Sequence, residues 1–270
     1  MDQAWSLLDA LDAGALRPRE LERHLFLEAR AHYLEGEGWR SFQKLEALAS
    51  KFPVTAFAPQ AAWMEFQIGK ALLDSRSGFL GLFSDRGYGL RVLKHLVIHY
   101  RDQTEPDRPG NVLADDALAL IGQVYWDKED WEESILRYTK LVQEHPESEW
   151  GPLALFRIAM AWFHRVEGPL YDQSFMERAE RELALFQGRE LGTPAQKKEA
   201  GAALERVRAW LAERSLFLAR YYATVGSPQG AEFYLDRTVR LYPDTEAARA
   251  AEQELPLWKE RAEADRKSVV

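Results

Sequence analysis

The sequence predicts an all-α protein, a superhelical solenoid of about five helical hairpins that ends in a C-terminal capping helix. Its 270 residues include many runs rich in alanine, leucine, glutamate and arginine and few segments rich in β-branched residues, a composition typical of helical proteins. Apolar residues recur at helical spacing in one segment after another, and several of the helix pairs end at a proline. A single hairpin cannot bury its own apolar face, so the pairs are expected to stack on one another.

The clearest hairpin spans 115–148, a stretch of 34 residues. Apolar side chains at i, i+3, i+4 and i+7 predict one helix on each side of a polar turn. Gly122 is the small residue at which the two helices approach each other, Asp130 is placed to cap the second helix, and Pro146 ends it. The length of the unit, the glycine and the proline agree with the period of tetratricopeptide repeats (TPRs). This hairpin therefore serves as the reference for the rest of the chain.

Two TPR-like hairpins are expected before the reference hairpin. The first begins at Pro18, because proline favours the first position of a helix, and ends at 51–55. The second joins a helix at 58–73 to a helix at 90–100. The glycine-rich segment 75–89 interrupts this second hairpin and is interpreted as an inserted loop.

Two further hairpins are expected after the reference hairpin. The fourth begins at Pro152, and its apolar stripe continues through a first helix, a longer turn and a second helix. The fifth combines the last turns of an unusually long helix, 197–225, with a shorter helix that is closed by Pro243. The small residue of the first helix falls 24 positions before the closing proline in both the reference and the fifth hairpin.

The ends of the chain and one connection complete the predicted architecture. A short amphipathic helix at 3–16 and a polar helix at about 245–264 are expected to cover the two ends of the solenoid. The polar segment 102–112 is expected to connect the second hairpin to the reference hairpin. The predicted domains are 1–150, with TPR-like repeats 1–3, and 151–270, with repeats 4–5 and the capping helix.

Composition excludes several classes of function. Lysine and arginine total 35 and aspartate and glutamate total 43, which gives a net charge of −8, and an acidic chain without a basic stripe is poorly suited to binding nucleic acid. The absence of cysteine excludes disulfides and thiolate chemistry. No run of about 18 apolar residues predicts a membrane-spanning helix, so direct membrane insertion is not expected. Asp2, Asp9 and Asp12 make the N-terminus unlike a signal peptide.

Catalytic and cofactor-binding motifs are not evident, so we expect a protein that is not an enzyme and that holds no cofactor. His95 and His99 have the spacing of a helical metal site, but no third ligand is evident, and ordinary histidines are favoured. The segment 78–89 is rich in glycine but does not follow a strand, so it is not a phosphate-binding loop.

Binding of partner proteins is the better expectation. In a TPR superhelix the first helix of each hairpin lines the concave face, and the register of the reference hairpin places Gln123 and Trp126 there. The equivalent positions are Arg30 and Tyr33 in the first repeat and Arg220 in the fifth. Aromatic and arginine side chains are common anchors of interfaces. The alternative is that the same side chains pack on neighbouring helices.

The proline-containing ends of three hairpins carry a resemblance to a known family. They resemble the tyrosine-proline-x-serine/threonine closers of the BamD family, the TPR lipoproteins of the outer-membrane β-barrel assembly machinery. The segments that carry the resemblance are Phe52-Pro53-Val54-Thr55, His145-Pro146-Glu147-Ser148, Tyr242-Pro243-Asp244-Thr245, Tyr171-Asp172-Gln173-Ser174 and Leu218-Ala219-Arg220-Tyr221-Tyr222. The resemblance covers about 20–262 and is specific in the last two repeats. The insertion at 75–89 and the lack of a lipid-bearing cysteine depart from the family pattern.

The resemblance implies a non-catalytic scaffold at the periplasmic face of the outer membrane. Its C-terminal half would bind the periplasmic POTRA repeats of the barrel-inserting subunit BamA, with Arg220 and Arg237 at the contact. Its N-terminal groove, which includes Arg30, would receive unfolded β-barrel precursors. A BamD-like protein also needs a lipid anchor, so a signal peptide and an acylated cysteine are expected to be encoded before Met1.

Three other functions agree with the sequence. One is a different periplasmic TPR adaptor that coordinates envelope assembly with cell-wall synthesis, and another is a cytosolic TPR adaptor. The third is the helical ring domain of a lytic transglycosylase without its catalytic domain. Co-purification with a β-barrel protein that carries POTRA repeats would separate a BamD-like function from the other periplasmic adaptor, and absence of activity on peptidoglycan would remove the third.

Overall fold

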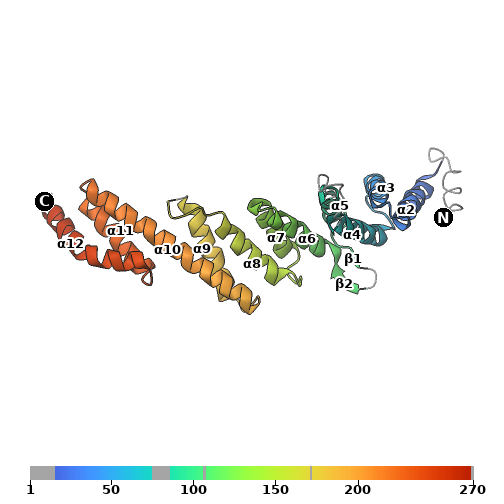
Figure 1. The fold of residues 1–270 in the computed structure, drawn as a ribbon. Coiled ribbons are helices and arrows are strands. Elements are labelled where there is room, and N and C mark those ends of the chain that lie inside the picture. Colours follow the sequence, from blue (N-terminus) through green and yellow to red (C-terminus); the bar gives the residue numbers. More distant parts are fainter. Residues whose placement is uncertain (1–15, 75–85, 106–107, 171, 269–270) are drawn as a thin grey trace, which may run out of the picture. The chain divides into compact units, whose positions relative to one another are not determined.

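The computed structural model describes residues 16–74, 86–105, 108–170 and 172–268, which are almost entirely α-helical (Figure 1). The all-α prediction is therefore confirmed. No helix within these ranges has the length and hydropathy of a membrane span. The helices are α2 (Pro18–Leu34), α3 (Gly38–Lys51), α4 (Ala58–Asp74), α5 (Arg86–His99), α6 (Leu113–Asp127), α7 (Trp131–Glu144), α8 (Gly151–His164), α9 (Gln173–Gly188), α10 (Pro194–Thr224), α11 (Pro228–Leu241) and α12 (Glu246–Ser268).

The chain divides into two compact units, each with its own packing. Unit 1 consists of Met1–Lys128 and Leu136–Trp150, and unit 2 consists of Glu129–Ile135 and Gly151–Val270. In unit 1, α2 packs on α3 and α4 packs on α5, so that consecutive helices form pairs. The first helices also contact one another, α2 with α4 and α4 with α6. The predicted helix at 3–16 lies outside the described residues.

Close helix contacts in unit 1 depend on glycine. A Cβ on Gly122 would lie 2.9 Å from the ring of Tyr138 on α7, which confirms the role predicted for this glycine. A Cβ on Gly69 of α4 would lie 2.6 Å from Leu93 of α5, and a Cβ on Gly89 would lie 2.9 Å from the carbonyl oxygen of Gly69. Any larger residue at these positions would push the helices apart.

The predicted loop at 75–89 is wrong at its C-terminal end. α5 begins at Arg86, so Gly87 and Gly89 are helical residues, and the rest of the segment lies outside the described residues. Gly89 is required by its contact with Gly69 rather than by a turn. Gly89 therefore marks a close helix approach, which the glycine-rich composition did not distinguish from a loop.

The connection at 102–112 contains a small antiparallel ribbon that the sequence did not predict. Strand β1 (Thr104–Glu105) pairs with strand β2 (Arg108–Val112), with Thr104 opposite Val112. Pro109 lies in β2, and a strand at the edge of a sheet tolerates proline because one side of its backbone needs no partner. The backbone N–H of Leu113 donates to the carbonyl of Gln103 at 3.0 Å, which joins the ribbon to the start of α6.

The hydroxyl groups in the three proline closers share one structural task. The oxygens of Thr55, Ser148 and Thr245 each accept a backbone N–H from two or three residues later, at 3.2 Å in all three cases. These bonds stabilise the turn into the helix that follows. The Thr55 hydroxyl also donates to Glu22 Oε1 at 2.7 Å, which fixes the first closer to α2.

In unit 2, α8 packs on α9, α10 packs on α11, and α11 packs on α12. The helix α10 is 31 residues long and begins at Pro194, three residues before the predicted start. Thr193 caps it: the hydroxyl oxygen accepts the N–H of Gln196 at 3.2 Å, and the Gln196 side chain accepts the N–H of Thr193 at 2.8 Å. This reciprocal pair and the proline together define the start of the helix.

One lysine of α10 closes the end of α9. Lys197 Nζ donates to the carbonyls of Phe186 at 2.6 Å and Gln187 at 3.0 Å, and it also bonds the carbonyl of Arg189. The last carbonyls of a helix have no partner within the helix, and their partial negative charge favours a cation. Lys197 therefore anchors the turn between α9 and α10.

Candidate protein-binding groove

A groove opens in unit 1 between α4, α6, β1 and the turn after α7. Its volume is about 300 Å³, at the lower end of the range for small ligand pockets. The groove is lined by Phe66, Gln67, Lys70, Glu105, Asp116, Leu120, Glu149 and Trp150. We call this set the groove residues.

The spacing of side chains on α4 and α6 places them in the groove. On α4, Phe66 and Lys70 are four residues apart and share one face, while Ile68 is buried on the opposite side. On α6, Asp116 and Leu120 repeat the same interval. Because α4 contacts α6, the two faces form adjacent walls.

Trp150 forms a fixed wall of the groove. Its indole Nε1 donates to Asp116 Oδ1 at 2.7 Å, and its backbone N–H donates to Ser148 Oγ at 3.2 Å. The first bond joins the closer after α7 to the first turn of α6, where a carboxylate is also favoured by the helix dipole. The indole is therefore held in place by bonds within unit 1.

The chemistry of the groove suits one large apolar side chain and the backbone around it. Phe66, Leu120 and Trp150 provide the apolar surface. Lys70 and Glu149 are exposed at the rim, where they remain in water. An apolar floor with a few polar groups at its edge is the usual construction of a recognition site.

The predicted binding residues of unit 1 do not line the groove. Gln123 and Trp126 lie on α6, which forms one of its walls, whereas Arg30 and Tyr33 lie on α2, which does not. Arg30 is exposed on α2, and Tyr33 is half-buried with its ring edge-to-face against Trp63 of α4, at a centroid distance of 5.8 Å. Gln123 is half-buried and donates to Asp127 Oδ1 at 2.7 Å. Trp126 is also half-buried. The structure thus joins Tyr33 to Trp63, which the sequence analysis had not selected.

The sequence did not predict most of the groove residues, because their positions in the sequence also fit core packing or a turn. Phe66 belongs to the apolar stripe that predicts α4, and periodicity assigns such residues to the core. Leu120 lies outside the stripe of α6, and Trp150 lies in a turn. Trp150 lies two residues after Ser148 of the closer. An aromatic side chain so close to the end of a hairpin was the sequence feature that could have indicated a binding residue.

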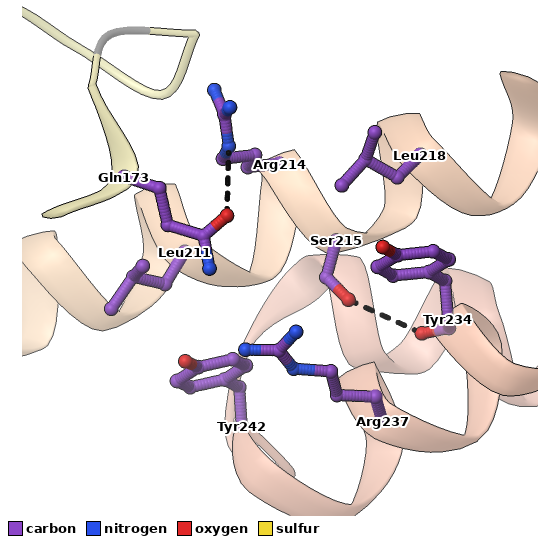
Figure 2. A pocket seen from close by; sticks show the side chains of 8 residues that line it. All are labelled: Gln173, Leu211, Arg214, Ser215, Leu218, Tyr234, Arg237 and Tyr242. Atoms are coloured by element: carbon purple, nitrogen blue, oxygen red, sulfur yellow. Dashed lines mark hydrogen bonds between the residues drawn. The ribbon is translucent and has the colours of Figure 1, made fainter. Parts of the chain in front are cut away.

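The two predicted arginines of unit 2 have different partners. Arg220 on α10 is exposed and forms an ion pair with Glu254 of α12 at 2.7 Å. Arg237 on α11 is half-buried, with Glu177 of α9 at 3.8 Å. Arg237, Arg214, Tyr234 and Tyr242 are among the residues that line a cavity of about 10 Å³, about the volume that one water needs. In Figure 2 Arg237 lies near Tyr242, whereas Arg214 lies apart from it and is bonded to Gln173. The cavity is too small to accept a partner side chain.

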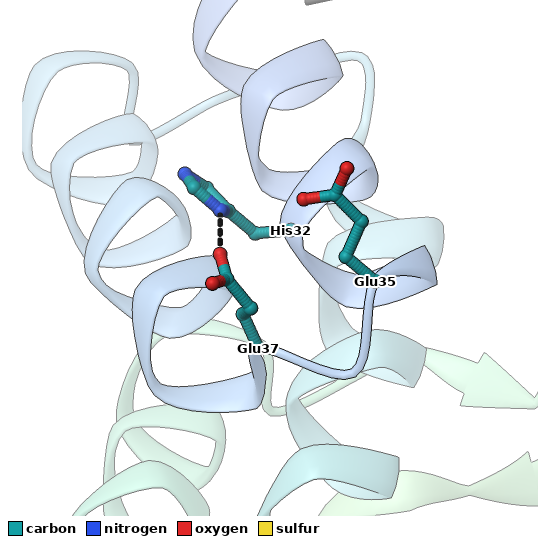
Figure 3. A group of neighbouring side chains, drawn as sticks. All are labelled: His32, Glu35 and Glu37. Carbon is teal, nitrogen blue, oxygen red and sulfur yellow. Dashed lines mark hydrogen bonds and ion pairs between the residues drawn. The ribbon is translucent and has the colours of Figure 1, made fainter. Parts of the chain in front are cut away.

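One group of ligand-type side chains in the described ranges is close enough to share a cation. The ligand atoms of His32, Glu35 and Glu37 lie within 4.8 Å of one another (Figure 3). His32 Nδ1 is 2.7 Å from Glu37 Oε2, and Arg40 donates to the other oxygen of Glu37 at 2.7 Å. The hydrogen bonds from His32 and then Arg40 lower the pKa of Glu37. These two partners already satisfy the carboxylate, so the arrangement does not require an ion.

The pair of histidines on α5 lies beside the buried Glu65, with His95 half-buried and His99 exposed. The rings of His95 and His99 are stacked at 4.2 Å, and His95 Nδ1 lies 3.0 Å from Glu65 Oε2 on α4. Burial raises the pKa of Glu65 to about 7, and burial also lowers the pKa of His99. The stacked rings face each other, which is unlike two imidazoles that converge on one metal.

No protein-family model matches this sequence, and no curated protein is significantly similar to it.

Proposed function

We propose that this chain is a non-catalytic scaffold that binds extended segments of partner proteins in the groove of unit 1. The observation that carries the proposal is the apolar wall formed by Phe66, Leu120 and Trp150, bounded by charged side chains. The hydrogen bonds of Trp150 hold this wall in its binding conformation. A preformed site loses little conformational entropy on binding, which favours capture of a flexible segment.

The architecture that we propose is a solenoid of about five TPR-like hairpins with α12 as its cap. Paired consecutive helices, contacts between successive first helices and glycine at the helix crossings support it. The hydroxyl bonds in the three closers also support it, because after α3, α7 and α11 a hydroxyl oxygen accepts a backbone N–H from two or three residues later. Repeats of this kind present long surfaces on which partners are bound.

The specific function that we propose is the one implied by the BamD resemblance. Unit 1 would receive unfolded β-barrel precursors, and unit 2 would bind the POTRA repeats of a BamA-like subunit at the periplasmic face of the outer membrane. An unfolded precursor offers an extended backbone with alternating apolar side chains, which suits a shallow groove with an apolar floor.

The groove is tested by a charge placed on its floor. Leu120→Arg should weaken binding of a fluorescent peptide from a β-barrel precursor by at least about tenfold, as removal of a central anchor does. Leu136→Arg is the matched control, because this leucine is exposed on α7, outside the groove residues. Anisotropy titration of both variants gives the result, and equal affinities would remove the groove from the function.

The partner of unit 2 is tested by titration with isolated POTRA repeats. Arg220→Glu or Arg237→Glu should weaken this binding, while Arg30→Glu in unit 1 should leave it unchanged. Glu254→Gln is a necessary control, because it removes the internal partner of Arg220 and leaves the arginine in place. Equal losses at Arg30 and Arg220 would contradict the division between the units. Binding of precursors without any binding of POTRA repeats would favour another periplasmic or a cytosolic adaptor.

A further inference from the structure

A cavity of about 590 Å³ lies in unit 2 between α10 and the turn that joins α11 to α12. This volume is in the middle of the range for ligand pockets. The cavity is lined by Glu205, Arg208 and Ala209 of α10 and by the consecutive residues Tyr242, Pro243, Asp244, Thr245 and Glu246. We call this set the acidic cavity. None of its members is a groove residue, so the inference below is independent of the proposed function.

The three carboxylates of the acidic cavity have no cation of their own. Glu205, Asp244 and Glu246 are exposed, and within the part of the chain that the structure describes none of them forms an ion pair. Arg208 is the one basic side chain in the described lining, and its Nε donates to Glu180 Oε1 of α9 at 3.1 Å. The start of α12 adds only about half a positive charge. The cavity therefore keeps an excess of negative charge.

A buried tyrosine also reaches the acidic cavity without a partner for its hydroxyl. Tyr242 is only 7% exposed, and its hydroxyl makes no hydrogen bond to any described residue. In Figure 2 its phenol oxygen lies at the end of the ring away from Arg237, which is paired with Glu177 at 3.8 Å. Burial raises the pKa of Tyr242, so the phenol stays neutral and can donate or accept. Buried polar groups usually have a partner, so this hydroxyl is available to a ligand.

We propose that the acidic cavity binds the guanidinium group of an arginine in a basic segment of a partner protein. A cation is favoured over an anion because the charges without a partner are carboxylates. A guanidinium presents five N–H donors in a fixed plane, so it can bond a carboxylate through two donors and still reach another acceptor. The ammonium of lysine is a compact point charge and lacks this fork.

The rest of the lining suits the arginine stem and the backbone beside it. Glu205 and Ala209 are four residues apart on α10 and share one face of the helix, so a carboxylate and an apolar surface lie together. Pro243 adds apolar surface on the opposite wall. Arginine packs its methylene groups on apolar surface while its head remains with polar groups. The cavity is also large enough to admit the backbone on either side of the arginine.

The test is an anisotropy titration of the full chain with a fluorescent nine-residue glycine-serine peptide that carries one central arginine. The same peptide with citrulline is the ligand control, because citrulline keeps the shape of arginine and removes its charge. A third peptide carries lysine. Salt at about 0.15 M screens charges that are more than about 8 Å away. The arginine peptide should bind saturably, and the other two should bind at least about fivefold more weakly.

Variants of the full chain identify the site. Glu205→Gln and Asp244→Asn should each weaken binding of the arginine peptide by about three- to fivefold, as the loss of one exposed charged partner does. Tyr242→Phe removes only the hydroxyl and should weaken binding by at least about twofold. These groups have no partner within the described residues, so the melting temperatures should match that of the wild type. Glu263→Gln is the matched control, because it removes the same charge from an exposed residue of α12 outside the cavity.

Three results would overturn the proposal. Equal binding of the arginine and citrulline peptides would show that charge does not matter, and equal binding of the lysine peptide would remove the selection of guanidinium. A loss in Glu263→Gln as large as that in Glu205→Gln would show that the peptide follows the overall charge of −8. Unchanged binding in Tyr242→Phe, with the losses at Glu205 and Asp244 intact, would remove the hydroxyl from the site.

Discussion

At Gly122 a single missing side chain sets the distance between two helices. The sequence predicted this glycine because its position matches the small residue of a TPR hairpin, and the Tyr138 ring occupies the space that a Cβ would need. The equivalent role of Gly89 was missed, because it ends a glycine-rich segment, and such composition is typical of a loop. Its partner, Gly69, lies on another helix, and sequence patterns do not identify such a contact.

Replacement of Gly122 should destabilise unit 1. Gly122→Ala places a methyl group 2.9 Å from the Tyr138 ring, and overpacking of this kind costs about 1–3 kcal/mol. Gly151→Ala is the control, since a Cβ there meets nothing within 4 Å and alanine favours the helix. Chemical denaturation measures both free energies of unfolding. A Gly122→Ala variant as stable as Gly151→Ala would show that the helices separate without cost.

Glu65 should make the stability of unit 1 depend on pH. Burial raises its pKa to about 7 in the folded state, from an ordinary value of 4.5. Between these values the folded protein holds a proton that the unfolded chain has lost, so the free energy of unfolding falls as pH rises. The neighbouring groups are His95, which bonds the carboxylate, and Glu46, whose charge raises the pKa further.

Glu65→Gln removes this titration and keeps an acceptor for His95. The variant should match the wild type near pH 5 and exceed it near pH 8, with a difference of up to about 3 kcal/mol. Denaturant unfolding at a series of pH values measures the difference. A constant difference between the two proteins across this range would show that Glu65 does not titrate within it.

At the scale of the elements, the periodicity of apolar residues predicted where the helices lie. It did not predict the contacts made at the ends of these helices. Pro18 and Pro194 both begin helices, as their fixed backbone angles favour. The ribbon β1–β2 was not predicted, because five residues around a proline carry no alternating pattern. The contact of Lys197 with the end of α9 was also not predicted, because it depends on the geometry of the turn.

Removal of the Lys197 ammonium should destabilise unit 2. Lys197→Met keeps an apolar side chain near Phe186, whose ring lies 4.7 Å from Nζ, but it leaves three carbonyls without this donor. The expected loss is about 1.5–3 kcal/mol, the range for hydrogen bonds with a charged group. Lys198→Met, at the adjacent exposed position, is the control and should be neutral. Equal stability of the two variants in urea would contradict the role of Lys197.

At the scale of the whole molecule, the sequence predicted an all-α chain, and the structure adds that the described helices pack in two compact units. The helix α7 is divided between them: Trp131 to Ile135 belong to unit 2, and Leu136 to Glu144 belong to unit 1. Periodicity treats such a helix as one element with one apolar stripe. The division therefore depends on tertiary contacts that a sequence pattern does not contain.

The division of α7 predicts where the chain can be cut. A fragment that ends at Trp150 should fold, because it keeps Tyr138 and Leu141, whose side chains are fully buried, and the bond from Trp150 to Asp116. A fragment that ends at Ile135 retains the first half of α7 but loses these contacts. Loss of two large buried side chains costs several kcal/mol, so its melting temperature should be lower by at least about 10 °C.

These two fragments are compared with a third, which ends at Lys128, by thermal unfolding monitored with circular dichroism. The fragments ending at Lys128 and Ile135 should melt together, because residues 129–135 make their contacts in unit 2. Trp131 illustrates the reason, since its ring stacks on His164 at 4.7 Å and has no such partner in the shorter fragments. If the fragment ending at Ile135 were instead as stable as the one ending at Trp150, the second half of α7 would not contribute to unit 1, and the boundary would lie after the helix.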